Sequence, residues 1–569
     1  MLSFPRFPGP SWWKLSALWA VITCQILAAD PPDWLEPYPP FKIAGNLYWV
    51  GSKDLASYLV TTPQGHILIN SSLEPSVPLI RASVEQLGFK FSDIKILLIS
   101  HAHWDHAAGS AKIKELTGAA YMVMEPDVPV VESGGRADFY YGSFPGSLYP
   151  PTKVDRILHD GDEVRLGGTT LVAHLTAGHT KGCTTWTLKV NEGGRDYDAV
   201  IVGSPNVNEG FDLVANQRYP SIAGDYARGF TVLKSLPCDL FLGAHGQYFG
   251  MLDKRARMKP GAANPFVDPA GYRSFVAERE QAFRTELARQ EAAVFTGLEK
   301  LGRVIVAPFA SAPFPHPARA EGHTYEGKRY TAAEHYADST VAIFIPQGFR
   351  ETDSIDFVVH FHGWRNTVAG TLATFHLAEQ LVASGKNAVL VVPEGPRDAP
   401  DSFGGRLEDA GGFQRFMDEV VATLHTRAGF KRPDFSVGRI ILSGHSGGYH
   451  VMAGILDRSG LDRNIAEVWL FDALYGQTGS FVAWAQRSPG RLIDLYTDHG
   501  GTKEETEKLI THLRAQDTTI LQAEEAQLDP ATLAGRHYVF IHTELTHNEV
   551  LDKRSQFARF LQTSVFADR

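Results

Sequence analysis

The sequence predicts an α/β protein built from two dissimilar domains. Strand signals at residues 47–50 and 58–62 begin a first region, in which strands and helical patterns alternate up to a charged helical pattern at 275–290. A segment rich in Pro and Ala, 308–319, follows and is typical of a linker. Beyond it, apolar runs separated by segments of helix length indicate a parallel sheet covered by helices on both faces. We therefore expect an N-terminal domain at 30–295, a linker at 296–338 and a second domain at 339–569.

Composition and net charge exclude several classes of protein and of binding partner. The chain has 569 residues, of which 44% are hydrophobic and 21% charged, as in ordinary globular proteins. Lys and Arg number 54 against 64 Asp and Glu, a net charge of −10 that is unsuited to a phosphate backbone. With only three cysteines, a disulfide framework and a cysteine-rich zinc module are both excluded. We expect a small-molecule substrate and no nucleic acid partner.

The N-terminus has the pattern of a secretory signal at residues 1–29. Arg6 and Lys14 precede an apolar run at 15–29 that ends in Leu27-Ala28-Ala29. The run is too short to cross a bilayer comfortably, although a retained membrane anchor is the alternative. We expect a periplasmic or secreted bacterial protein with no stable membrane span after signal cleavage.

A dense group of metal-ligand residue types follows the apolar run at 94–99. The motif is His101-Ala102-His103-Trp104-Asp105-His106. Buried imidazoles and a carboxylate without partners would carry a desolvation cost that a bound cation removes. Imidazole nitrogen and carboxylate oxygen suit Zn²⁺ without any cysteine. The sequence therefore predicts a metal site at the end of this strand.

With Gly178-His179-Thr180 and Gly243-Ala244-His245 downstream, this region resembles the metallo-β-lactamase superfamily. Ser204 stands where glyoxalase-like members carry a metal-bridging aspartate and two lactamase subclasses carry a cysteine, and a serine there resembles class B, subclass three β-lactamases. Arg218-Tyr219-Pro220 agrees with that resemblance, which covers residues 34–290. It implies a four-layered αβ/βα sandwich with two metals at the sheet edges.

The resemblance also implies roles for individual residues. Two zinc ions are implied, the first held by His101, His103 and His179 and the second by Asp105, His106 and His245. Ser204 is expected near the carboxylate of the substrate and is not a ligand. The implied activity is opening of the β-lactam ring of antibiotics by a zinc-bound hydroxide, with Asp105 as part of the catalytic machinery. A lactone, or another cyclic amide or ester, is the alternative substrate for the same dizinc site.

A second candidate site lies in the C-terminal region. The predicted strand at 439–443 leads into Gly444-His445-Ser446-Gly447-Gly448, and a helical pattern follows at 449–456. Strand, G-x-S-x-G and helix in that order are the context of a nucleophile elbow, a sharp turn that exposes the serine Oγ. Together with the apolar runs, these features resemble the α/β-hydrolase fold, a doubly wound sheet, from about Val341 to Phe566.

The order of residues along the chain indicates which acid and which histidine would act with Ser446. Asp498 follows the apolar run at 492–495 and His547 follows the run at 538–541, so we expect a Ser446–His547–Asp498 triad. Asp472 is the competing acid, and His542 is a weaker rival because it lies within a predicted strand. The segment 361–364 is expected to supply the oxyanion loop, with the Gly447 N–H as the other donor. The alternative is a non-catalytic binding module that keeps the fold.

Overall fold

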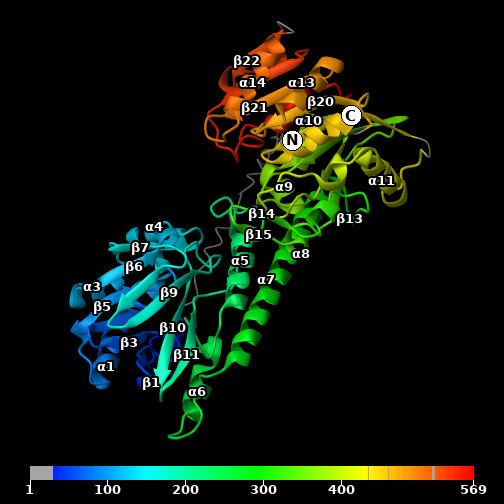
Figure 1. Cartoon of the computed structure of the whole chain (residues 1–569). Helices are drawn as coiled ribbons and strands as arrows, with labels where there is room; N and C mark the ends of the chain where they lie inside the picture. Colours follow the sequence, from blue (N-terminus) through cyan, green and yellow to red (C-terminus); the bar gives the residue numbers. More distant parts are fainter. Residues whose placement is uncertain (1–29, 433–434, 459, 516–518) are drawn as a thin grey trace, which may run out of the picture.

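The computed structural model describes residues 30–432, 435–458, 460–515 and 519–569. The expected signal at 1–29 lies outside the described residues. Figure 1 shows two lobes, one mainly blue to cyan and the other green to red, with the long green helix α7 (Pro269–Leu298) running from one to the other. Within the described part of the chain, no helix is both long and apolar enough to cross a membrane.

The N-terminal lobe is built on two facing sheets. The seven-stranded sheet runs in chain order, antiparallel from β1 to β4 and parallel from β4 to β7. The five-stranded sheet has the order β12-β11-β10-β9-β8, with only β11 and β12 parallel. The strands are β1 Phe41–Ala44, β2 Leu47–Trp49, β3 Tyr58–Thr62, β4 Gly65–Ile69, β5 Ile94–Leu98, β6 Ala120–Met124, β7 Arg156–Leu158, β8 Glu163–Leu166, β9 Thr169–Leu175, β10 Thr184–Glu192, β11 Arg195–Val202 and β12 Leu240–Gly243.

One apolar core lies between these two sheets, and helices cover their outer faces. Trp49 of the first sheet and Trp186 of the second are fully buried in the same cluster. Helices α1 and α3 pack on the first sheet, whereas α5 and α7 pack beside the second. The helices of this lobe are α1 Val77–Gln86, α2 Trp104–Ala107, α3 Ser110–Thr117, α4 Val128–Glu132, α5 Ile222–Ser235 and α6 Met251–Arg257. The layers are therefore those of an αβ/βα sandwich.

The C-terminal lobe has one nine-stranded sheet in the order β13-β16-β18-β17-β19-β20-β21-β23-β22. From β18 to β22 all neighbours are parallel, and β13 and β16 form an antiparallel edge. The central strands are continuous apolar runs because both of their faces are covered, whereas the edge strands β13 and β22 are only partly buried. The strands of this sheet are β13 Gly302–Pro308, β16 Thr340–Pro346, β17 Ser354–Phe361, β18 Val389–Pro393, β19 Ser436–His445, β20 Ile465–Phe471, β21 Arg491–Thr497, β22 Ile520–Glu524 and β23 Tyr538–Thr543.

Helices pack on both faces of this sheet. Helices α9, α10 and α16 contribute buried side chains to one apolar cluster, and α11 to α14 contribute to the other. The remaining elements are the hairpin β14 His323–Tyr325 and β15 Lys328–Tyr330, and the short helices α8 Ala332–His335 and α15 Pro530–Leu533. The larger helices are α9 Val368–Phe375, α10 Leu377–Ser384, α11 Gly412–Arg427, α12 Gly448–Arg458, α13 Thr478–Arg487, α14 Lys503–Arg514 and α16 Gln556–Gln562. The expected alternation of strands and helices is present.

The segment 296–338, expected to be a linker, is part of the folded structure. Helix α7 continues to Leu298, and β13 pairs with β16 from Gly302 opposite Pro346 to Pro308 opposite Thr340. Beyond that strand, Phe309 and Phe314 are buried. The Pro and Ala content suggested an extended segment, but apolar side chains spaced through it gain more by burial than a solvated linker would. The C-terminal fold therefore begins near residue 302.

Ion pairs join the two lobes beside α7. Arg228 of α5 lies 2.9 Å from Asp398, and Arg397 lies 3.1 Å from Glu291 of α7 and 3.0 Å from Asp338. Burial would lower the pKa of Arg397, but the surrounding carboxylates outweigh it and raise that pKa. The segment around Arg397 therefore contacts the N-terminal lobe through charges of both signs.

Leu442 tests how much the C-terminal core depends on its central strand. It is fully buried on β19, between β17 and β20. We expect Leu442→Ala to lower the free energy of unfolding of the C-terminal lobe by about 2–5 kcal/mol, because it removes buried methyl groups and leaves a cavity. In contrast, Val565→Ala, at a side chain of the same lobe that is 44% exposed, should change it by about 0.5 kcal/mol or less. Urea unfolding followed by circular dichroism measures both, and equal effects would contradict this packing.

Candidate functional site

The sequence motif of metal-ligand types lies on one loop and the first turn of a helix. Strand β5 ends at Leu98, and His101 and His103 follow in the loop before α2. Asp105 and His106 lie in the first turn of α2, and all four side chains are buried. The position of the loop is fixed near its start, where the Ser100 N–H donates to the Asn70 side chain over 2.7 Å.

Two further histidines reach the same place from the second sheet. His179 lies in the loop between β9 and β10, and His245 directly follows β12. The ring of His179 is 4.7 Å from those of His101 and His103, and the ring of His245 is 4.9 Å from that of His106, measured between centroids. The structure thus brings together all six residues expected as ligands.

The first group consists of His101, His103 and His179, whose candidate ligand atoms lie within 4.8 Å of one another. The other ring nitrogens of two members have partners: His179 Nδ1 donates to the Asn206 carbonyl over 2.9 Å, and His101 Nδ1 lies 3.3 Å from Ser100 Oγ. Nε2 of these rings is therefore free to face the group. In His103, Nε2 lies 3.6 Å from the Asp138 carboxylate, which leaves Nδ1 as the nitrogen that can face the group.

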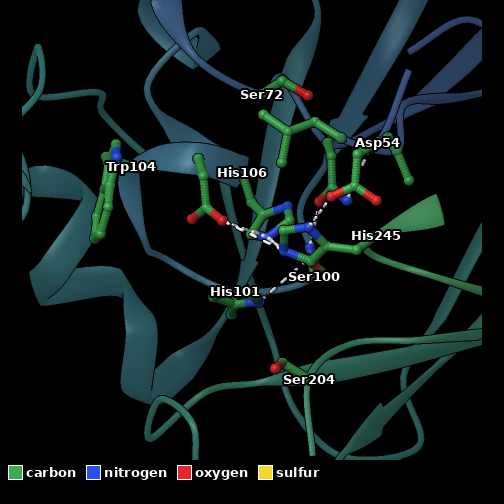
Figure 2. A network of polar contacts seen from close by, with 12 residues as sticks. Asp54, Ser72, Ser100, His101, Trp104, His106, Ser204 and His245 are labelled. Atoms are coloured by element: carbon green, nitrogen blue, oxygen red, sulfur yellow. Dashed lines mark hydrogen bonds and ion pairs between the residues drawn. The ribbon is translucent and has the colours of Figure 1, made fainter. Parts of the chain in front are cut away.

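The second group consists of Asp105, His106 and His245. His106 Nε2 lies 3.2 Å from His245 Nε2, and these nitrogens lie 3.1 and 3.4 Å from Asp105 Oδ2. Ligands about 2.0–2.1 Å from one tetrahedral zinc ion would lie roughly 3.3–3.4 Å apart, so the spacing fits a shared metal. Behind the ring, His245 Nδ1 donates to Asp54 over 3.0 Å (Figure 2). This second contact orients the ring and fixes its tautomer.

Several of the candidate ligands are in the charge state that binds a cation. The exception in the second group is His245, because Asp105 and Asp54 outweigh its burial and raise its pKa to about 9. Burial, together with the neighbouring histidines, lowers the pKa of His179 to about 3 and that of His101 well below its ordinary value. These rings are therefore neutral, the form that binds metal. For Asp105, burial would raise the pKa, but His106 and His245 outweigh it and the pKa is lowered well below its ordinary value. Asp105 is thus a carboxylate that donates no proton.

Three carboxylates that support the site were not identified from the sequence. Asp127 accepts from the Ala102 N–H over 2.9 Å and from the Thr180 hydroxyl and the Gly182 N–H over 2.8 Å each. Asp54 holds His245, and Asp138 lies 3.6 Å from His103 Nε2. None of the three stands at a characteristic spacing from its partners in the sequence, because the contacts form only when distant segments of the chain come together in the fold.

The hydroxyl of Ser204 already has a hydrogen-bond partner in the protein. The residue is buried just beyond β11, and its Oγ lies 3.1 Å from the Tyr248 hydroxyl. Figure 2 shows Ser204 apart from the histidine network. Nearby, Cys183 is a buried free thiol whose pKa is raised by burial to about 12, in keeping with a structural role. A contact between Ser204 and a substrate carboxylate stays a prediction.

In the C-terminal lobe, Ser446 lies on the sharp turn between β19 and α12. Its backbone φ is +54°, a strained conformation for a non-glycine residue. Gly363, just after β17, lies against it: a Cβ on Gly363 would be 2.8 Å from Ser446 Oγ. The Tyr475 hydroxyl also interacts with the Ser446 side chain. Only a glycine fits at position 363, so backbone N–H groups can approach the serine closely.

The acid beside His547 is Asp472, not Asp498 as expected from the sequence. His547 Nδ1 donates to Asp472 Oδ2 over 2.6 Å. Asp498 lies at the exposed end of β21 and instead bonds His542 over 3.0 Å and Lys503 over 2.7 Å. The physical reason is strand order: Asp472 follows β20, which directly neighbours the serine strand β19, whereas β21 lies one strand farther away.

Local contacts fix this acid and place the histidine beside the serine turn. Burial would raise the pKa of Asp472, but hydrogen bonds from His547 and Thr502 outweigh it and lower that pKa. The ring of His445, which precedes Ser446, stacks 4.6 Å from that of His547, and its Nε2 donates to the His547 carbonyl over 2.8 Å. Ser446, His547 and Asp472 thus lie at the same end of the sheet, where its parallel strands end.

Behind Gly363 lies a buried ion pair that the sequence did not indicate. His362 Nε2 lies 2.8 Å from Glu394, whose other oxygen accepts from the Val368 N–H over 3.1 Å. His362 Nδ1 donates to the Gly363 carbonyl over 2.9 Å. The pair fixes the backbone of the expected oxyanion loop on both sides.

Comparisons with known proteins place the N-terminal lobe in a family. Residues 55–193 match the model of the metallo-beta-lactamase superfamily. Among curated proteins, the chain is 29% identical over 176 residues to a cytoplasmic hydroxyacylglutathione hydrolase of Arabidopsis thaliana, covering 30% of this chain and 57% of that protein. It is 31% identical over 137 residues to a hydroxyacylglutathione hydrolase of Hyphomonas neptunium, covering 24% and 44%. The chain thus spans about half the length of these curated relatives.

Solved structures are similar over the same region. The native FEZ-1 metallo-beta-lactamase from Legionella gormanii is 55% identical, with 45% of this chain and 98% of that one covered and a TM-score of 0.45. BJP-1, a subclass B3 metallo-beta-lactamase of Bradyrhizobium japonicum, is 38% identical, with 46% and 98% covered and a TM-score of 0.44. Since the family match coincides with the sandwich and the ligand groups described above, the N-terminal lobe of this chain is a metallo-beta-lactamase superfamily domain.

Proposed function

We propose that the N-terminal site opens the β-lactam ring with two zinc ions bound. The observation that carries this proposal is the convergence of six ligand residues in two adjacent groups, one of three histidines and one with the spacing of a tetrahedral zinc site. Zinc bound there would lower the pKa of water to near neutrality and polarise a carbonyl oxygen. Ser204 supports assignment to subclass three, because a serine stands at the position where other branches of the superfamily carry an aspartate or a cysteine.

The chain's own residues provide an oriented and partly enclosed place for the substrate. Asp54 and the Asn206 carbonyl hold His245 and His179 at their outer nitrogens, so that neither ring turns when the substrate binds. The ring of Tyr141 lies 5.0 Å from that of His103 and 5.2 Å from that of Trp104. These aromatic side chains would cover an apolar part of a small-molecule substrate and limit water beside the reacting amide.

We propose a second, independent activity for the C-terminal lobe: a serine hydrolase of the α/β-hydrolase type at residues 339–569. The observation that favours catalysis over a binding module is the 2.6 Å contact between His547 and the buried Asp472 beside the strained Ser446. His547 would take the Ser446 proton as the Oγ attacks an ester carbonyl, and would return it to the leaving alcohol. Asp472 would hold the imidazole in the required tautomer, as a positioning residue.

We also propose that residues 1–29 direct export to the periplasm or beyond the cell, followed by cleavage of the signal. The support is the sequence pattern alone, a basic start and a short apolar run that ends in small residues. A β-lactam-opening enzyme acts usefully in that compartment, since it meets the antibiotic before the antibiotic reaches the cell wall machinery.

Metal analysis and hydrolysis of a chromogenic cephalosporin test the first proposal. We expect about two zinc ions per chain after reconstitution, loss of lactam opening with a chelator, and recovery when zinc is returned. Asp105→Asn should lower kcat by more than about a hundredfold, because it removes the anionic ligand of the second group. Ser204→Ala, which removes one hydrogen bond to Tyr248, should cost less, and the exposed Asp253→Asn should cost nothing.

The same assays identify a different substrate class. If the zinc-loaded protein leaves cephalosporins intact but hydrolyses a lactone or a glutathione thioester, the dizinc site stands and the β-lactamase proposal is wrong. If no metal binds after reconstitution, the dizinc site itself is wrong.

Asp127 is expected to act on zinc affinity although it touches no zinc. Asp127→Asn replaces one acceptor oxygen by an N–H donor facing other donors, so the Ala102 and Thr180 loops should separate. We expect zinc affinity to fall about 10–100-fold, measured by competition with a chromophoric chelator. Asp155→Asn, at a half-exposed carboxylate that accepts from the Tyr121 N–H, is the matched control. Equal affinities in all three proteins would contradict the linking role.

Two aspartate variants distinguish the acid of the serine site. Asp472→Asn should lower kcat for a short-chain ester on the order of a thousandfold or more, because His547 loses the partner that sets its tautomer. Asp498→Asn should leave ester hydrolysis within about twofold, since that side chain bonds His542 and Lys503 at the surface. A fluorophosphonate probe should label Ser446 in the wild type. A larger loss of kcat in Asp498→Asn than in Asp472→Asn would identify Asp498 as the acid that orients His547.

A further inference from the structure

A small cavity opens directly beside the serine turn. Its volume is about 30 Å³, and Gly363 and Gly447 form part of its wall. These are the residues that would supply the oxyanion N–H groups, so the cavity begins where the carbonyl carbon of a bound ester would lie. Since one water needs roughly 10–15 Å³ of such space, the cavity has room for about two or three non-hydrogen atoms.

The far wall of the cavity is held by side chains that have other partners. Phe403 packs edge-on against Phe314, with ring centroids 6.2 Å apart, and the Arg319 guanidinium lies 4.7 Å from the Phe403 ring. Arg319 in turn bonds both oxygens of Asp401, over 2.6 and 3.2 Å. The cavity therefore cannot lengthen on this side without breaking an aromatic contact and a bidentate ion pair.

Two further residues of the cavity wall, Ser402 and Val451, are also closely packed. A Cβ on Gly447 would lie 2.8 Å from Ser402 Oγ, so Ser402 stands directly against the turn. Val451 belongs to the large apolar core on one face of the sheet and is 6% exposed. Packing of this density resists even one added methylene.

The opposite side of Ser446 is open. Tyr475, whose hydroxyl interacts with the Ser446 side chain, is 39% exposed, and Trp364, next to Gly363, is 43% exposed. A substrate therefore meets a narrow, partly open cavity on one side of the reacting carbon and the solvent-facing side chains of Tyr475 and Trp364 on the other. This asymmetry separates the acyl part of an ester from its alcohol part.

We propose that the Ser446 site takes esters of a two-carbon acyl group, acetyl, on an alcohol that stays in the open side of the site. The inference rests on the serine hydrolase activity proposed above. Ser446 Oγ bonds to the acetyl carbon, the bond from that carbon to the alcohol oxygen breaks, and the alcohol leaves with the proton that His547 took from the serine. Water then attacks the acetyl carbon, the bond from that carbon to Ser446 Oγ breaks, His547 passes the proton of the water to Ser446 Oγ, and acetic acid is released.

Hydrolysis of p-nitrophenyl acetate, butyrate, hexanoate and octanoate by the full chain tests the proposal. Each added methylene alters discrimination in a closed apolar pocket by roughly 10–200-fold, so kcat/KM for the butyrate should be at least about a hundredfold below that for the acetate. Ser446→Ala should abolish turnover of all four esters, which assigns the activity to this site.

Widening the cavity should relax the preference. Val451→Ala is expected to raise the butyrate-to-acetate ratio of kcat/KM by about tenfold. Val420→Ala, the same change at a fully buried α11 residue away from the cavity, should leave the ratio unchanged. If Val451→Ala does not fold, Phe403→Leu opens the far wall and should shift the ratio in the same direction.

The outcomes separate this inference from the proposal beneath it. If the probe labels Ser446 and all four esters are turned over at similar kcat/KM, the serine hydrolase stands and the acetyl preference is wrong. If no ester is turned over and the probe labels nothing, the hydrolase proposal fails, and the acetyl inference fails with it.

Discussion

The metal-ligand groups depend on one buried carboxylate, Asp127. The histidines come from two sheets, and loops at the edges of separate sheets have no covalent reason to stay in register. Asp127 accepts from backbone or hydroxyl donors in the loop of His101 and in the loop of His179, and so connects them. Burial raises its pKa to about 6, so the carboxylate is held in place at an electrostatic cost that its three donors offset only in part.

The same arrangement recurs in the serine site with different groups. There the Glu394 carboxylate connects His362 of the β17 loop to the start of α9, and Asp472 connects His547 to the end of β21. In both lobes the groups placed to react are carried by loops, and buried carboxylates on other elements fix those loops. A site spread over several strand ends needs such connections, because each loop alone has a low local stability.

The sequence predicts those features that depend on residues close together in the chain, and it does not predict those that depend on contacts between distant segments. The motif from His101 to His106 is contiguous, and strand, G-x-S-x-G and helix around Ser446 form one continuous segment, so sequence spacing was enough to find both. The choice between Asp472 and Asp498 depended on which strand lies next to β19, and sequence order places both acids equally well. The expected linker at 296–338 was wrong because composition does not show that β13 has a strand to pair with.

Helix α7 determines how the two sites relate in space. Its 30 residues extend about 45 Å at 1.5 Å per residue, with Phe275 and Phe283 in the core of one lobe and Leu298 in that of the other. A boundary placed within α7 therefore cuts this helix, and a boundary placed just after it removes Leu298 from the core of the C-terminal lobe. The helix and the ion pairs beside it thus join the lobe with the metal-ligand groups to the lobe with the serine turn. Because both lobes belong to one chain, the two candidate sites are always present in equal number.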